Sequence, residues 1–190
     1  EKIKISSNIE LNPFYFTTNI FFEEYKLNFL IQEFLPMLTL YNTEILGNLN
    51  GILKINLEKI DNEFINKGQI VFSINEKTIN SEKNFFKIDG GDINSKISYL
   101  YDKGDLIFDS KNILEIKNKK KFSKKFQIKL SKLNSINKIY FNLKKNIDTG
   151  KISISEIKIN DLNNNKLFNK IYTVENIQEL RSLLKKILKT

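Results

Sequence analysis

Alternation of apolar and polar residues over long stretches is the feature that most constrains the fold of this chain. The same period of two recurs in residues 70–75, 93–101, 139–143 and 152–159. Side chains of a β-strand point to opposite faces in turn, so the pattern predicts strands with one apolar face. The longest run lies in residues 45–57, where every second position is apolar or glycine: Ile45, Gly47, Leu49, Gly51, Leu53, Ile55 and Leu57.

Short turn-forming sequences separate the predicted strands. They combine Gly with Asn or Asp, which favours tight hairpin turns. Strands joined by tight turns are antiparallel neighbours, so we expect a β meander of eight to ten strands over about residues 44–160. At Ser155–Glu156 the alternation slips by one residue, which predicts a β-bulge. The turn sequences are Asn66-Lys67-Gly68, Asp89-Gly90-Gly91-Asp92, Asp102-Lys103-Gly104-Asp105 and Asp148-Thr149-Gly150.

Two segments repeat apolar residues with helical spacing, one near each end of the chain. The first covers about residues 24–36, and Pro36 predicts a stop or kink near residue 35. The second covers about residues 174–189 and carries Lys185, Lys186 and Lys189 in its last turns, as the helix dipole favours. We therefore expect a single β-rich segment over residues 1–190, with an amphipathic helix toward each end.

The composition excludes most kinds of enzyme. The chain has no Cys and no His, which removes disulfides, thiol nucleophiles, the common zinc sites and His-based acid–base catalysis. No phosphate-binding glycine loop is present. We expect no catalytic residue, no metal and no cofactor. The acidic turn residues lack the spacing of a calcium loop and are interpreted as turn formers: Asp89, Asp92, Asp102, Asp105 and Asp109.

The net charge of +9 is not interpreted as a sign of nucleic-acid binding. Arg181 is the single arginine and Ala is absent, whereas Lys, Asn and Ile abound, a skew typical of an A/T-rich genome. Guanine and phosphate recognition would favour Arg, so we expect no nucleic-acid partner. The lysines of residues 117–125, with Phe122 and Phe126, are interpreted as a solvated loop or short helix; contact with anionic lipid or nucleic acid is the alternative.

An antiparallel sheet with one apolar face must cover that face. A second sheet, helices or an apolar ligand would each do so. From the alternation alone, a closed β-sandwich core is favoured over an open groove, because apolar stripes usually form a core. The C-terminal helix has two interpretations, a cap packed on the end of the sheet or a helix lying on a membrane surface.

The order of these segments resembles the C-terminal region of the AsmA-like family, the Gram-negative envelope proteins of the TamB and YhdP type. The resemblance covers about residues 10–190 and lies in pattern and order. It is carried by Gly47-Asn48-Leu49-Asn50-Gly51-Ile52-Leu53-Lys54-Ile55-Asn56-Leu57, Gly68-Gln69-Ile70-Val71-Phe72, Phe86 to Asp92, Tyr99 to Phe108, Lys125-Phe126-Gln127-Ile128 and Lys138 to Leu143. The Lys- and Asn-rich composition is similar to that of versions from A/T-rich alphaproteobacteria.

The resemblance implies a mainly β fold: a long, curved, groove-like antiparallel sheet in the periplasm. It implies anchoring to the inner membrane by an N-terminal segment absent from this chain. The expected function is then a non-enzymatic lipid conduit for envelope biogenesis, with phospholipid acyl chains as partners, other envelope proteins as further candidates, and membrane contact through the C-terminal helix. The alternative is a structural or protein-binding β-sandwich module with no lipid. The expected lipid-binding residues are Leu49, Leu53, Ile55, Leu57, Ile70, Phe72, Ile74, Ile93, Ile97, Tyr99 and Phe108.

Overall fold

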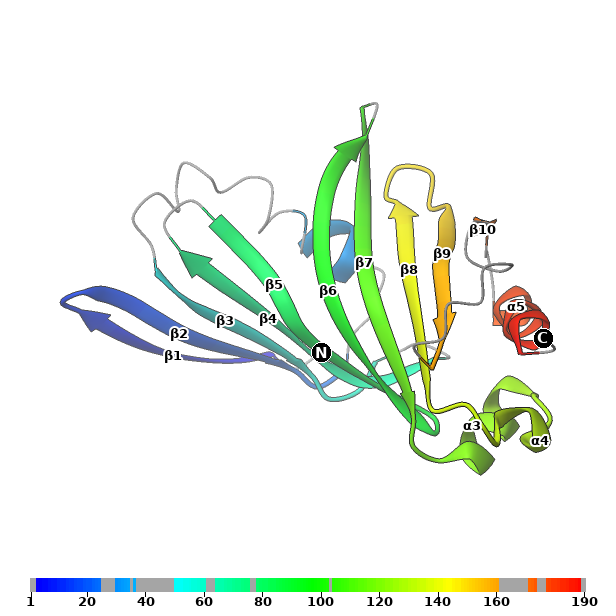
Figure 1. Cartoon of the computed structure of the whole chain (residues 1–190). Helices are drawn as coiled ribbons and strands as arrows, with labels where there is room; N and C mark the ends of the chain where they lie inside the picture. The colour runs from blue at the N-terminus through cyan, green and yellow to red at the C-terminus, as the bar shows by residue number, and fades with distance from the viewer. Residues whose placement is uncertain are drawn as a thin grey trace. The chain divides into compact units, whose positions relative to one another are not determined.

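A computed structural model describes residues 3–24, 30–34, 36, 50–60, 64–75, 78–102, 104–160, 171–173 and 177–188. Two compact units are present: Glu1–Phe86 with Lys96–Tyr99, and Lys87–Ser95 with Leu100–Thr190. One open sheet of ten strands includes strands of both units, and its spatial order follows the sequence from β1 to β10 (Figure 1). The predicted mainly β, mostly antiparallel fold is therefore confirmed; of the ten strands described, seven lie within residues 44–160, where eight to ten were expected.

The strands are longest in the middle of the sheet and shortest at the edge formed by the last strand of the chain. They are β1 (Ile3–Leu11), β2 (Phe14–Phe22), β3 (Asn50–Leu57), β4 (Ile65–Asn75), β5 (Thr78–Ile88), β6 (Gly91–Asp102), β7 (Asp105–Ile116), β8 (Lys138–Asn146), β9 (Ile152–Ile159) and β10 (Tyr172–Thr173). The helical segments are a π-helix, η1 (Leu30–Phe34), and the α-helices α3 (Lys119–Phe126), α4 (Leu130–Leu133) and α5 (Ile177–Ile187).

The first unit departs from a simple meander at its N-terminal end. β1 and β2 form an antiparallel hairpin that was not predicted from the sequence. β2 then pairs with β3 in parallel, so the chain must cross back between them, and the segment between these strands contains η1. Of the helix expected over about residues 24–36, the structure describes a bend at Glu24, the helix η1 and Pro36; residues 25–29 and 35 lie outside the described part of the chain.

The hairpin turn expected at Asn66-Lys67-Gly68 is wrong. These residues lie inside β4, and Gly68 pairs with Leu57 of β3. A side chain on Gly68 would collide with the ring of Phe86, so this glycine permits close packing rather than a turn. Because both roles select glycine, the local sequence did not distinguish them.

In the second unit the turns and the bulge follow the predictions. Gly90, Gly104 and Gly150 have positive φ angles of 87°, 94° and 73° in the connections β5–β6, β6–β7 and β8–β9. Between β8 and β9 the register shifts by one residue, and Glu156 there adopts a φ of 52°. The β-bulge predicted at Ser155–Glu156 is thus confirmed.

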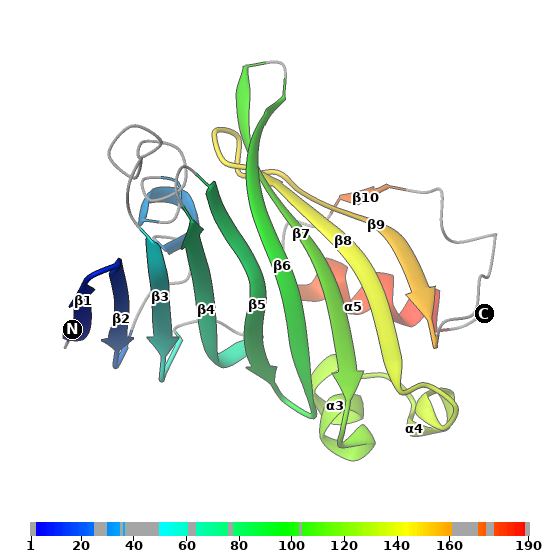
Figure 2. The same ribbon diagram turned by 60° about the vertical axis from the view of Figure 1, so that its left-hand side comes forward.

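Three helices of the second unit, α3, α4 and α5, are seen in Figure 2. In α3, Asn118 accepts a hydrogen bond from the Lys121 amide as the N-cap. α5 confirms the predicted C-terminal helix, and the Nε of its Arg181 donates to the carbonyl of Lys125 at 3.2 Å. The buried residues of the three helices are Phe122, Phe126, Leu133, Leu183, Leu184 and Ile187.

Candidate apolar binding surface

The strand register gathers most of the predicted lipid-binding residues of the first unit on one face. In the β3–β4 ladder Leu53 lies opposite Phe72, and Ile55 lies opposite Ile70. Residues on the same strand two positions apart share a face. The set on this face is therefore Leu53, Ile55 and Leu57 of β3 with Ile70, Phe72 and Ile74 of β4.

These predicted residues are buried within the chain itself. Each of the six has a relative exposure of 9% or less, as do Ile97 and Phe108, while Ile93 and Tyr99 are half-buried. Leu49 lies outside the described residues. The buried members form core, so a charge at Leu53 or Phe72 is expected to unfold the protein before it tests any ligand.

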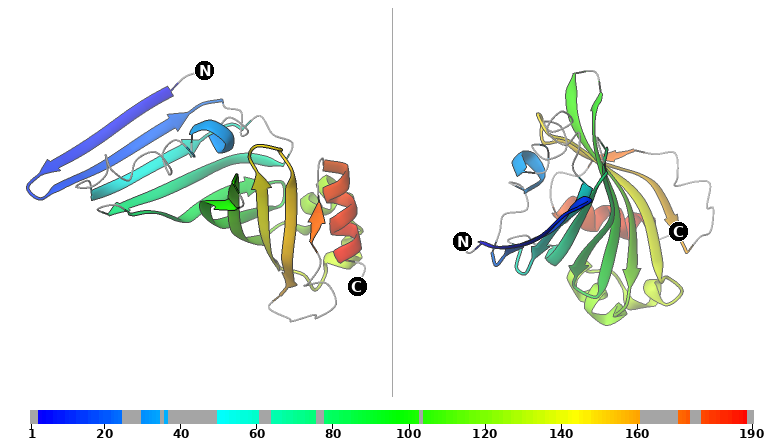
Figure 3. Two further views of the ribbon diagram at one scale, coloured as in Figure 1. Left: turned by 90° about the horizontal axis from the view of Figure 1, so that it is seen from above. Right: turned by 90° about the vertical axis from the view of Figure 1, so that its left-hand side faces the viewer.

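The same apolar face continues onto the N-terminal hairpin, where it becomes exposed. Across the ladders, Ile55 lies opposite Ile20 of β2, which lies opposite Ile5 of β1. We call Ile3, Ile5, Ile9 and Leu11 the β1 apolar face; their exposures are 52%, 66%, 55% and 81%. β1 is the outermost strand beside β2 (Figure 3). An exposed apolar stripe of this kind marks a binding surface more often than an isolated exposed side chain does.

Alternating apolar residues in β1 are the sequence signal that indicates this strand. Ser7 interrupts the apolar series, and its hydroxyl lies 2.8 Å from that of Thr18. The opposite face of β1 is polar, and its Lys4 pairs with Glu23 at 3.1 Å. The strand is therefore amphipathic across its two faces, with the apolar side continuous with the core.

Gly51 of β3 lies where the buried strands pair with the exposed hairpin. It lies opposite Phe16 of β2, and a side chain at Gly51 would collide with the backbone oxygen and the ring of Phe16. Because Gly51 has no side chain, Phe16 packs closely against β3.

In the second unit the buried face contains polar groups. Ser95 Oγ donates to Asn112 Oδ1 at 2.6 Å, and Asn112 Nδ2 donates to the carbonyl of Ser110 at 2.9 Å. All three residues are buried. Asn112 Nδ2 also lies 3.0 Å from Ser110 Oγ, so this cluster satisfies its own hydrogen bonds inside the sheet.

Lys145 also lies on this face, opposite Phe108 of β7 and Ile152 of β9. It is 8% exposed, and burial lowers the pKa of its amine. In the first unit, burial raises the pKa of Tyr99, whose hydroxyl donates to the carbonyl of Ile31 in η1 at 2.7 Å. That bond fixes η1 against β6.

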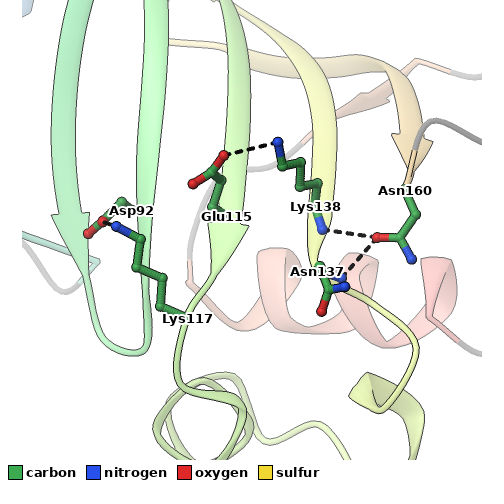
Figure 4. Close-up of polar contacts among 6 residues, drawn as sticks. All are labelled: Asp92, Glu115, Lys117, Asn137, Lys138 and Asn160. Carbon is green, nitrogen blue, oxygen red and sulfur yellow. Dashed lines mark hydrogen bonds and ion pairs between the residues drawn. The ribbon is translucent and has the colours of Figure 1, made fainter.

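The acidic turns are used in ion pairs and hydrogen bonds within the chain. Asp92 pairs with Lys117, a contact that raises the pKa of the Lys117 amine, and Asp89 pairs with Lys125 at 3.3 Å. Figure 4 shows the first of these pairs between the start of β6 and the end of β7. Among the described residues no group of three His, Cys, Asp or Glu side chains is placed to hold a metal ion.

The aromatic side chains of the lysine-rich segment are buried and are not exposed to solvent. Phe122 and Phe126 of α3 are 0% and 3% exposed, with ring centroids 4.4 Å apart. Lys119 donates to the carbonyl of Asn134 at 2.7 Å. Base stacking on these rings would therefore require α3 to unpack, which agrees with the interpretation of the segment as a short helix.

The C-terminal helix buries the side chains that a membrane contact would need. Leu183, Leu184, Ile187 and Leu188 are between 2% and 8% exposed. This arrangement fits the packed cap rather than a helix on a membrane surface. Within the described ranges, no helix combines the length and apolar character needed to cross a bilayer.

Comparison with known proteins yields no relative for this chain. No protein-family model, no curated protein sequence and no solved structure matches it.

Proposed function

We propose that this chain is a non-enzymatic lipid-binding segment, related in role to the periplasmic conduits of AsmA-like envelope proteins. The observation that carries the proposal is the continuity of one apolar face from the buried strands β3 and β4 to the exposed β1 apolar face. Acyl chains laid on that face would leave water at about 0.8 kcal/mol per buried methylene. Such binding needs no reactive group.

The exposed part of the face is the proposed point of contact with lipid. Ile5 and Leu11 are 66% and 81% exposed, so a ligand reaches them without unfolding the core. The buried strands support this surface by holding β2 in register through Phe16 and Gly51. Periplasmic location and membrane anchoring through a segment outside this chain are part of the same proposal.

The test is native mass spectrometry of the folded chain mixed with dioleoylphosphatidylethanolamine. Ile5→Glu places a charge on the β1 apolar face, and Ser6→Glu places the same charge on the adjacent, opposite face. Both positions are exposed, so both variants are expected to fold. We expect lipid adducts on the parent chain and on Ser6→Glu, and their loss on Ile5→Glu. Absence of adducts on the folded parent chain would refute the proposal.

The second candidate is a structural or protein-binding module with no lipid. It is favoured by the burial of eight of the predicted residues, from Leu53 at 9% to Ile55 at 0%, because a buried residue serves as core. A lipid-free mass for a folded parent chain is the result that this candidate predicts.

A further inference from the structure

β1 is a regular edge strand with little to block further pairing. All nine of its residues are exposed, and it stands at the end of the strand order. Its ladder with β2 runs from Ile3 to Leu11 without a register shift, and it contains no proline. Edge strands usually carry prolines, bulges or several charges that prevent pairing with another chain. Here the outward edge is a template for one more strand.

The sequence of β1 is complementary to itself when read in the antiparallel direction. With Ser7 at the centre, Ser7 opposes Ser7 and Ser6 opposes Asn8. The face that carries Lys4 and Glu10 brings these two opposite charges together, twice in a symmetric pair. The apolar face aligns with itself in the same register, since Ile3 opposes Leu11 and Ile5 opposes Ile9.

Other registers lose this match. A shift of one step that keeps the faces aligned sets Lys4 against Asn8 and Ile5 against Ser7, and it shortens the ladder. Cross-strand partners of opposite charge stabilise an antiparallel pair, and like charges destabilise it. We propose that a second copy of this chain pairs with β1 in the register centred on Ser7, giving a two-fold symmetric dimer.

The pairing requires little rearrangement of either copy. Lys4 is paired with Glu23, but the two side chains are 72% and 42% exposed, and an exposed pair of this kind contributes little to stability. Lys4 is therefore able to exchange Glu23 for Glu10 of the second copy. The interface is isologous, with the same strand used by both copies, so it closes at two. The β1 apolar faces of the copies then form one surface.

Charge reversal tests the register, with sedimentation velocity on lipid-free protein as the readout. Lys4→Glu or Glu10→Lys each turns two attractive pairs into two repulsive ones, and we expect the dimer to weaken about 10- to 100-fold. The double reversal K4E/E10K restores opposite charges and is expected to restore the dimer. Lys59→Glu is the control: it makes the same charge change as Lys4→Glu and breaks another exposed pair, Lys59–Glu24, that includes no residue of β1.

A single cysteine gives a second, geometric test because the chain has none. In the proposed register two copies of Ser7→Cys face each other at the Cα separation that a disulfide accepts. Two copies of Ser6→Cys would stand roughly 8 Å apart, beyond that range. We expect a cross-linked dimer under mild oxidation for Ser7→Cys and none for Ser6→Cys.

Two kinds of result would refute the proposed dimer. A parent chain that stays monomeric at every concentration shows that the edge is unoccupied or belongs to another partner. A dimer that survives both single reversals, or that cross-links equally through residue 6, uses a different surface or register. Because these measurements contain no lipid, their failure leaves the lipid proposal standing, and failure of lipid binding leaves the dimer standing.

Discussion

Replacement of Asn84 by Leu is expected to destabilise the first unit through loss of a buried hydrogen-bonding group. Asn84 is 1% exposed. Its Oδ1 accepts from the Val71 amide and from Ser81 Oγ, each at 3.0 Å, and its Nδ2 donates to the Ser81 carbonyl at 3.0 Å. Leucine has a similar size but neither donates nor accepts, so it removes these three bonds while filling the space.

The expected cost follows from the buried groups that lose their partner. A buried donor or acceptor left unsatisfied costs about 1–3 kcal/mol, and an ordinary lost hydrogen bond costs about 1 kcal/mol. We therefore expect the free energy of unfolding to fall by about 3 kcal/mol. For a chain of this size that corresponds to a fall in Tm of about 6–12 °C.

Urea unfolding followed by far-ultraviolet circular dichroism measures this change. Asn80→Leu is the matched control, because Asn80 lies on the same strand, β5, but is exposed. Ser81→Ala removes one hydroxyl donor and should cost about 1 kcal/mol. If Asn84→Leu and Asn80→Leu unfold at the same urea concentration, the network contributes nothing and the reasoning is wrong.

Three further predictions concern other positions. Gly51→Ala should lower the free energy of unfolding by about 1–3 kcal/mol in urea titrations, since the new methyl group meets Phe16; unchanged stability would contradict this packing. Lys145→Met should raise the urea midpoint at pH 7. The lowered pKa of Lys145 makes the folded protein hold its proton less tightly than the unfolded chain, so parent stability rises with pH and the gap closes toward pH 10.5. A gap that is constant with pH would show that Lys145 is not desolvated. Asn160→Ala should lower the free energy of unfolding by about 1–3 kcal/mol, measured by calorimetry, because Asn160 Oδ1 accepts hydrogen bonds from the amides of residues 137 and 138 (Figure 4) and the residue has a φ of 49°. Asn160→Gly should lower it less, because glycine adopts a positive φ without strain. Equal losses for the two variants would show that the positive φ adds no cost for alanine.

Local patterns predicted most of the second unit because its connections are short. The bulge at Glu156 and the turn at Gly90 depend on residues adjacent in sequence, so alternation and turn chemistry were sufficient. The parallel pairing of β2 with β3 joins Phe16 to Gly51, and no local signal specifies such a distant partner. The edge of the sheet formed by β1 and β2 was therefore not predicted from the sequence.

The predicted lipid-binding residues are apolar and many of them share a face, but most are buried rather than exposed. Alternation shows which side chains share a face, as it did for Leu53 and Phe72, but it does not show what covers that face. Burial depends on the whole chain. Ile5 and Leu11, the exposed members of the same face, lay in a strand where Ser7 broke the pattern.

The parallel pairing of β2 with β3 has a consequence for the order in which the chain folds. The β1–β2 hairpin is local, and its residues leave the ribosome before those of its partner strand, which begins only at Asn50. Until Leu57 has been synthesised, the apolar side of the hairpin has no sheet to join. Contacts of such long sequence separation form slowly, because a loop must close before they yield any stabilisation. During synthesis the nascent hairpin therefore exposes apolar surface that favours aggregation until β3 has formed.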